Sequence, residues 1–182
     1  MKKIIIFLFF FIFCSTCVVA NETNKKLNKL FEDLLISTHT TSLKIEQKIW
    51  KLWSTHPNDN RLTLMLEKGS DAVNNNELFK AIDIFTNVIN LDPKWAEPWN
   101  KRATVFYIIG EYKKSQNDIN KVLELEKRHF GALAGQGLVN IKLKNYEKAI
   151  KSYENALKIY PSMQSPERMI KEIEALIKQD LI

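Results

Sequence analysis

Residues 130–163 read FGALAGQGLVNIKLKNYEKAIKSYENALKIYPSM, and this stretch decides the fold. Two earlier stretches, residues 62–95 and 96–129, have the same length of 34 residues and align with it without a gap. Equal periods of this size are typical of repeat proteins, in which each repeat is a small supersecondary unit that stacks on its neighbours. The sequence therefore predicts three tandem repeats.

Each window keeps small and large residues at fixed positions. The small residues at positions 8 and 20 are Gly69, Ala103, Gly137, Ala81, Ser115 and Ala149. Large residues at positions 4 and 24 are Met65, Trp99, Leu133, Phe85, Ile119 and Tyr153. Small residues let two antiparallel helices approach closely, and large ones fill the volume beside the crossing. Each window is therefore predicted to form a helical hairpin.

Turn residues lie in the middle and at the end of each window. Asn76, Gly110 and Asn145 suit the left-handed conformation in which many helices end. Pro93 and Pro161 end the second helices of the first and third windows, because proline cannot continue a helix. These signals predict second helices near Glu77 to Asn90, Tyr112 to Leu125 and Tyr146 to Ile159.

The three windows resemble the tetratricopeptide repeat. The resemblance implies a right-handed superhelix of helical hairpins, and it implies binding of peptides or protein segments. The segments Trp99 to Thr104 and Arg128 to Leu133 also look like parts of exported proteobacterial repeat proteins with little assigned function. We therefore expect an all-α, tetratricopeptide-type helical solenoid that works as an interaction protein rather than as an enzyme.

Terminal elements are expected to cover the apolar ends of the stack. Ser165 and Pro166 begin an amphipathic stretch that predicts a C-terminal capping helix. Upstream, two apolar stripes predict a helical pair packed on the first repeat, with a turn over residues 37–42. The predicted units are a signal peptide, a helical pair, three repeats and a cap, over residues 1–20, 21–61, 62–95, 96–129, 130–163 and 164–182.

Trp50 and Trp53 lie on the second of these stripes, where core packing is the favoured interpretation and an exposed patch for a membrane or partner is the alternative. Arg102, at position 7, is expected to point between repeats and pair with an acidic neighbour.

The N-terminus has the pattern of a secretory signal peptide. Lys2 and Lys3 precede the apolar run Ile4 to Phe13, and small residues end at Ala20. The run is shorter than the roughly 20 residues of a membrane-spanning helix. We therefore expect an exported, periplasmic protein, with two alternatives: an uncleaved membrane anchor, and lipidation at Cys17.

Charge and residue inventory exclude several classes of function. The formal net charge is +6, and lysines alternate with acidic residues instead of forming arginine-rich, aromatic patches, so we expect no nucleic-acid partner. Both cysteines lie in the leader. His39, His56 and His129 fall in predicted turns without metal-ligand spacing. We predict no catalytic residues, no metal and no cofactor.

Certain positions of the first helix in each repeat line the concave surface in the family, and the resemblance implies the same role here. They hold Leu66, Ser70, Val73, Asn74, Asn100, Lys101, Thr104, Tyr107, Ile108, Gly131, Ala134, Gly135, Leu138, Ile141 and Lys142. In the best understood family site, lysine, arginine and asparagine side chains grip a C-terminal carboxylate. Those positions here hold Leu66, Ser70, Lys101, Gly131 and Gly135, so we expect no such clamp.

The third repeat has three glycines in its first helix, although each costs about 1 kcal/mol relative to alanine. Position 8 explains Gly137. Gly131 and Gly135 predict a smooth apolar seat for a helix or an extended segment, flanked by Tyr107, Ile108, Leu138 and Ile141. The alternative is that Gly131 lies near a helix start and Gly135 relieves local crowding.

The leading functional hypothesis is a scaffold or adaptor of the cell envelope that holds a polypeptide segment in the concave groove. The alternative is a structural subunit of an envelope complex that is fixed to the membrane through an uncleaved leader.

Overall fold

The computed structural model describes residues 22–180, so the predicted leader lies outside the described residues. Within this range every regular element is an α-helix, which confirms the predicted all-α class. No helix among these residues is both long and apolar enough to span a bilayer. A helix over residues 22–36 is followed by α2 (His39–Trp53), α3 (Asn60–Asn74), α4 (Leu78–Leu91), α5 (Ala96–Ile108), α6 (Tyr112–Leu125), α7 (Phe130–Lys142), α8 (Tyr146–Ile159) and α9 (Gln164–Asp180).

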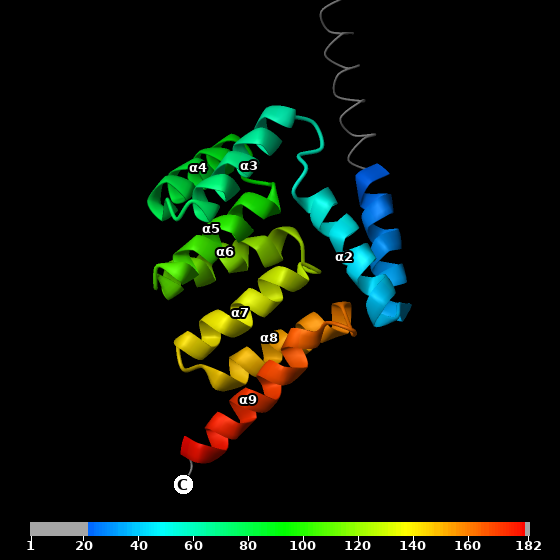
Figure 1. Cartoon of the computed structure of the whole chain (residues 1–182), viewed down its shortest axis with the longest axis vertical. Helices are drawn as coiled ribbons and strands as arrows, with labels where there is room; N and C mark the ends of the chain where they lie inside the picture. The colour runs from blue at the N-terminus through cyan, green and yellow to red at the C-terminus, as the bar shows by residue number, and fades with distance from the viewer. Residues whose placement is uncertain (1–21, 181–182) are drawn as a thin grey trace, which may run out of the picture.

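Three helical hairpins, α3/α4, α5/α6 and α7/α8, stack one on the next, and α9 continues the stack at its C-terminal end (Figure 1). Ile173 of α9 is buried against Ala149 and Tyr153 of α8. The solenoid and its capping helix are therefore present as predicted. The cap begins at Gln164, and Pro166 lies in its first turn, where the missing N–H has no helical partner to lose.

Close contact at position 8 holds two of the hairpins together. A Cβ atom added to Gly69 would lie 2.3 Å from the Phe85 ring, and one added to Gly137 would lie 2.5 Å from the Tyr153 ring. In the middle repeat, the Ser115 hydroxyl donates to the Ala103 carbonyl oxygen at 2.8 Å. Small and large residues therefore meet across the first and third hairpins, and the two small residues meet across the middle one, so the spacing brings the helices close as predicted.

The turns inside the hairpins place one residue each in the left-handed region. These residues are Asn76 (φ 60°), Gly110 (φ 81°) and Lys144 (φ 59°). The prediction of Asn145 for the third turn is wrong, because α7 ends at Lys142 and Asn145 directly precedes α8 with φ −94°. The repeat register therefore fixes the left-handed position, although lysine has no special tolerance for it.

Arg102 pairs with an acidic neighbour as predicted, but that neighbour belongs to its own hairpin, and a bond to α4 reaches the preceding one. Its guanidinium donates to both carboxylate oxygens of Asp118 at 2.7 and 2.8 Å, and to the Thr86 hydroxyl at 2.9 Å. The Asp118 carboxylate is almost fully buried, and a bidentate bond of this kind is the geometry that compensates for the loss of water.

The N-terminal helical pair packs mainly on the third repeat, so the predicted placement on the first repeat is wrong. The core of the pair includes Phe130 and Tyr160, which begin α7 and follow α8. Its other buried members are Leu27, Phe31, Leu34, Ile45, Ile49 and Trp53. The physical reason is that the start of α7 and the residue after α8 present two large aromatic rings, Phe130 and Tyr160, which are almost fully buried against the pair.

The turn inside this pair is also shorter than predicted. Only Ser37 and Thr38 are non-helical, because Ser42 is buried inside α2. Its hydroxyl donates to the His39 carbonyl oxygen at 2.7 Å and lies 3.2 Å from the Tyr160 hydroxyl oxygen. Trp53 is buried and Trp50 packs against the same cluster, so these tryptophans form core and not an exposed patch.

The crossing at position 8 can be tested with two neighbouring glycines of α7. Gly137→Ala should lower the melting temperature by about 3–10 °C, because overpacking costs roughly 1–3 kcal/mol. Gly135→Ala is the matched control, since its Cβ would meet only Ile119 Cδ1 at 3.8 Å. The control should melt at the same or a higher temperature than the wild type. Equal melting temperatures for the two variants, measured by circular dichroism, would show that the close crossing does not limit stability.

Candidate functional site

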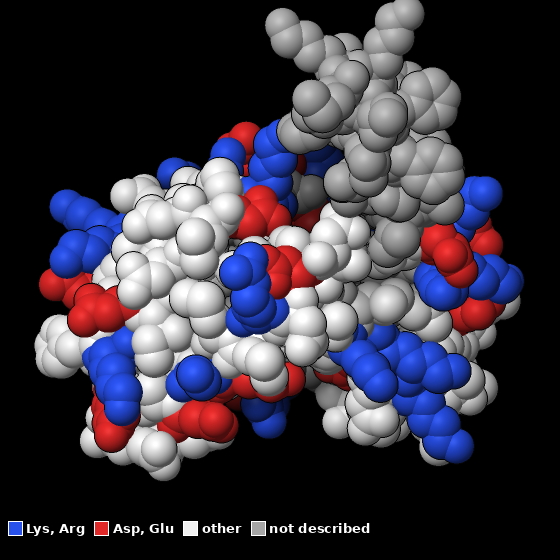
Figure 2. Space-filling view, turned by 90° about the horizontal axis from the view of Figure 1, so that it is seen from above, with Lys and Arg blue, Asp and Glu red and all other residues white. Residues whose placement is uncertain are grey.

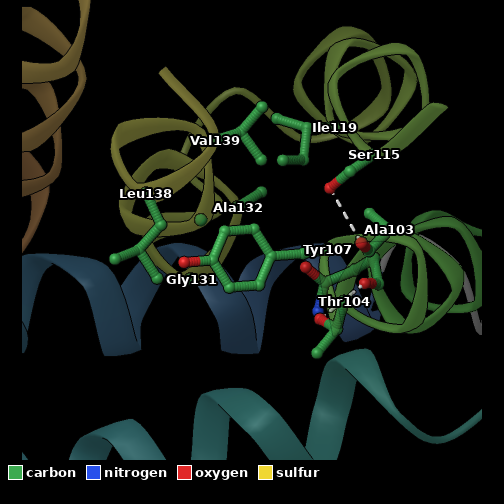
Figure 3. Close-up of a pocket in the computed structure, with 11 residues that line it drawn as sticks. Ala103, Thr104, Tyr107, Ser115, Ile119, Gly131, Ala132, Leu138 and Val139 are labelled. Atoms are coloured by element: carbon green, nitrogen blue, oxygen red, sulfur yellow. Dashed lines mark hydrogen bonds between the residues drawn. The ribbon is translucent and has the colours of Figure 1, made fainter. Parts of the chain in front are cut away.

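A small pocket opens between the second and third repeats, on the side lined by their first helices, α5 and α7. Its volume is about 70 Å³. It is lined by Asn100, Ala103, Thr104, Tyr107, Ser115, Ile119, Gly131, Ala132, Gly135, Leu138 and Val139 (Figure 3). We call this feature the inter-repeat pocket.

The floor of the inter-repeat pocket is buried and apolar. Ala132, Val139 and Ile119 are buried, and they come from α7 and α6. The only hydroxyl at the floor, that of Ser115, already donates to the Ala103 carbonyl oxygen (Figure 3). A group that enters the pocket therefore meets hydrocarbon.

Tyr107 and Leu138 form opposite walls of the pocket. The Tyr107 ring extends across it toward Leu138 (Figure 3), and it packs on the Tyr112 ring with centroids 5.6 Å apart. Leu138 keeps 37% of its surface exposed. Between them, a Cβ atom at Gly135 would have one neighbour, Ile119 Cδ1 at 3.8 Å. The missing side chain of Gly135 therefore leaves open space rather than relieving crowding.

Gly131 has a different reason for its missing side chain. A Cβ atom there would lie 2.5 Å from Trp50 Cη2 and 2.8 Å from Trp50 Cζ2. The predicted partner seat at Gly131 is therefore already covered by α2 of the same chain. The sequence analysis missed this contact because the residues are 81 positions apart.

The structure brings together six of the predicted groove residues in the inter-repeat pocket: Asn100, Thr104, Tyr107, Gly131, Gly135 and Leu138. Leu66 leaves the candidate set, because it is 2% exposed and belongs to the core of the first hairpin. Ser70 donates its hydroxyl to the Leu66 carbonyl oxygen at 3.1 Å. Other predicted groove residues lie outside the pocket: Asn74, Lys101, Ile108, Ile141 and Lys142. Of these, Asn74, Ile108 and Lys142 are exposed.

Lys101 is held by a buried carboxylate that the sequence analysis did not single out. The Lys101 Nζ atom lies 3.5 Å from Glu97 Oε1, and the Glu97 side chain is fully buried. His129 Nε2 lies 3.2 Å from Glu97 Oε2. Because His129 Nδ1 accepts from the Ala132 N–H at 3.0 Å, the Nε2 atom carries the proton that Glu97 accepts. The Trp53 ring stacks on His129 with centroids 4.0 Å apart.

This cluster has a structural role, since it fastens α2 to the junction of the second and third repeats. Within residues 22–180, no three or more side chains of the metal-binding types gather in a way that could hold an ion. In the sequence, this cluster is marked only by a carboxylate at position 2 of the second repeat, Glu97, and a histidine at its last position, His129. Both residue types are commonly exposed to solvent, so the pair gives no clear signal.

Electrostatics leave the inter-repeat pocket neutral, because none of its lining residues carries a charge. Beside it, burial raises the pKa of Tyr153 well above its usual value, so this phenol stays neutral. At the repeat junction, burial works to raise the pKa of Glu126, but hydrogen bonds from the Arg128 side chain and backbone lower it below its usual value. The pocket therefore suits an uncharged group.

Known proteins share this architecture. The family model described as tetratricopeptide repeat matches residues 131–163. The chain therefore contains a tetratricopeptide repeat at these residues. It is 38% identical over 78 residues to a TPR repeat-containing protein of Rhizobium etli, and the match covers 43% of this chain and 38% of that relative.

Solved tetratricopeptide repeat structures support the same fold. The first TPR domain of Spaghetti (RPAP3), bound to the HSP90 peptide SRMEEVD, is 21% identical, with a TM-score of 0.63 and coverage of 64% of this chain and 93% of that one. The Sgt2 TPR domain from Aspergillus fumigatus is 18% identical, with a TM-score of 0.63 and coverage of 67% and 82%. These likenesses are structural.

Four of the five carboxylate-clamp positions are engaged in other contacts, and the fifth, Gly135, has no side chain. Leu66 is core, Ser70 bonds to the backbone, Lys101 lies beside Glu97, and Gly131 is covered by Trp50. The expectation that no clamp is formed therefore agrees with the side-chain positions.

A double-mutant cycle tests the contact between α2 and α7. Gly131→Ala should lower the free energy of unfolding, because Trp50 is wedged against Trp53, His129 and Phe130 and cannot easily move. In a Trp50→Leu background the same change should cost less, with a coupling energy of about 0.5–3 kcal/mol in urea denaturation. Additive effects of the two substitutions would mean that Trp50 does not rest on Gly131 in solution.

Proposed function

We propose that this protein is an interaction scaffold that holds a polypeptide segment in its concave groove, anchored at the inter-repeat pocket. The observation that carries the proposal is the open, uncharged space beside Gly135, which no side chain of the described chain fills. Structures of the same fold support it, since the first TPR domain of Spaghetti binds an HSP90 peptide.

The size of the pocket indicates what anchors the segment. A volume of about 70 Å³ is roughly half that of an engineered cavity of about 150 Å³ that binds benzene. A short aliphatic side chain therefore fits, and an aromatic ring does not. Burial of one such side chain contributes about 1.5–3 kcal/mol, which is enough to set a preference among peptides.

Polar groups at the rim complete the site. The Thr104 hydroxyl is exposed and donates to the Asn100 carbonyl oxygen at 3.1 Å, which leaves its own lone pairs free to accept from a peptide N–H. The Asn100 amide is half-buried beside Glu97. Since α2 covers the start of α7 at Gly131, the segment has to lie toward the other end of the groove, near Ile108 and Lys142.

Selection from a display library of short random peptides tests this site. Peptides enriched on the wild-type protein should share one aliphatic residue. Gly135→Leu should weaken their binding about ten- to hundred-fold, because the new side chain fills the cavity that the peptide needs. Affinities can be measured by fluorescence polarisation.

Phe79→Ala is the control for this experiment, because Phe79 is 74% exposed on α4, outside the pocket. Its variant should bind the selected peptides as the wild type does. Unchanged peptide affinity in a Gly135→Leu protein that melts normally would reject the inter-repeat pocket as the anchor.

The cellular setting is the second part of the proposal. The apolar run Ile4 to Phe13 after two lysines supports export, and we propose an adaptor of a cell-envelope complex. A structural subunit held by an uncleaved leader is the alternative, and the same sequence feature favours it. In both cases the repeats would present the groove outside the cytoplasm.

N-terminal sequencing of the protein from cells separates the two settings. A released adaptor should start at Asn21 and appear in the periplasmic fraction. A chain that starts at Met1 and sediments with membranes would support the anchored subunit, and a chain that starts at Met1 in the cytosol would contradict export altogether.

A further inference from the structure

The outer face of the N-terminal helical pair contains a second, larger concave feature, which we call the lysine-rimmed groove. It has a volume of about 690 Å³ and lies between the helix of residues 22–36 and α2. Its lining residues are Lys25, Lys26, Lys29, Leu30, Lys48, Lys51, Leu52 and Thr55. It shares no residue with the inter-repeat pocket.

Helix periodicity explains why the groove is both apolar and basic. The inward stripes of the two helices, represented by Phe31 and Ile49, are buried in the core. Leu30 and Leu52 lie beside those stripes and form the floor, where both are half-buried. The lysines occupy the outward stripes, so their alkyl stems extend the apolar walls and their ammonium groups mark the rim.

Positive charge at the rim is only partly compensated. Lys26 pairs with Glu22 at 3.0 Å and Lys29 with Asp33 at 2.9 Å, each along its own helix. Within the described part of the chain, Lys25, Lys48 and Lys51 have no carboxylate in ion-pair range, and no acidic residue lines the groove. Basic side chains lie next to one another on this side of the molecule in Figure 2.

Exposed apolar residues continue the same surface. Ile36 is 87% exposed, and it follows Lys29 by seven residues, which is two helical turns and therefore the same face. Leu35 beside it is 50% exposed. Apolar tips next to uncompensated lysines are typical of surfaces that bind an anionic membrane interface.

We propose that the lysine-rimmed groove binds anionic phospholipid at a bilayer surface. The lysines would pair with lipid phosphate groups, Leu30 and Leu52 would contact the acyl region, and Ile36 would enter the interface. An acidic amphipathic peptide has matching chemistry, but the position of the groove in the chain favours lipid. Lys25 follows the apolar run Ile4 to Phe13 by twelve residues, so in the anchored setting a membrane-inserted leader would hold the groove close to the headgroups.

Vesicle flotation of the full chain tests the proposal. Binding is compared for vesicles of phosphatidylcholine alone and vesicles with 30% phosphatidylglycerol. The leader contributes to both, so the measured quantity is the anionic increment, which is the gain in binding caused by phosphatidylglycerol. The variant Lys25→Gln/Lys48→Gln/Lys51→Gln should reduce that increment at least about ten-fold, because each lysine near an anionic surface contributes about a factor of five. Ile36→Ser should weaken binding to both vesicle types.

The matched control is Lys80→Gln/Lys113→Gln/Lys158→Gln, which removes the same charge from exposed residues of α4, α6 and α8. It should keep the full increment. If both triple variants lost the anionic increment equally, net charge alone would explain vesicle binding, and the lysine-rimmed groove would be rejected as the lipid site. Tight binding of a fluorescent acidic amphipathic peptide, lost in the groove variant and without any anionic vesicle preference, would overturn the lipid in favour of a protein partner.

Discussion

Close approach of helices within each hairpin is the constraint on which the rest of the structure depends. Gly69 and Gly137 bring the backbone of a first helix onto an aromatic ring of the second, and Ala103 with Ser115 does the same through a hydrogen bond. Only this spacing leaves the first helices aligned side by side along the stack. The inter-repeat pocket follows from this alignment, because it forms between two such helices, α5 and α7, where Gly135 has no side chain to fill the space.

Three glycines of α7 show how one residue type serves three purposes. Gly137 serves the hairpin crossing, Gly131 makes room for Trp50 of the N-terminal pair, and Gly135 borders open space. The helix tolerates about 1 kcal/mol of lost propensity at each position because tertiary contacts offset it at two of them. Gly135 has no such compensation among the described residues. A residue that weakens its helix without improving the packing is typical of a functional site, which supports a binding role for Gly135.

The repeat fold could be predicted from local patterns in the sequence, but contacts between distant residues could not. The 34-residue period sets the hairpins and even the left-handed residue, since Lys144 takes the conformation that Asn76 and Gly110 take at the same position. The docking of the N-terminal pair joins residues that are far apart in the sequence, such as Trp53 with His129 and Ser42 with Tyr160. Periodicity within one helix says which face is buried, but it does not say against what.

The candidate site could likewise be predicted only in part from the sequence. Family positions correctly bring Tyr107, Gly135 and Leu138 to one pocket, because position within a hairpin determines the direction of a side chain. They include Leu66, which the first hairpin buries, and they omit Glu97, whose carboxylate is removed from solvent by His129 and Lys101. Packing inside the first hairpin decides the case of Leu66, and contacts with Lys101 and His129 decide that of Glu97. The list of family positions contains no information about either set of contacts.

The N-terminal pair connects the two surfaces for which we propose ligands. Its inner face, through Trp50 and Trp53, closes the groove at the start of α7 and leaves the pocket beside Gly135 as the open part. Its outer face presents Lys48 and Lys51 to solvent. Because both faces belong to the same two helices, a lipid bound outside and a polypeptide bound inside would be connected through one packed core. That arrangement would suit a protein that presents a captured segment next to a membrane.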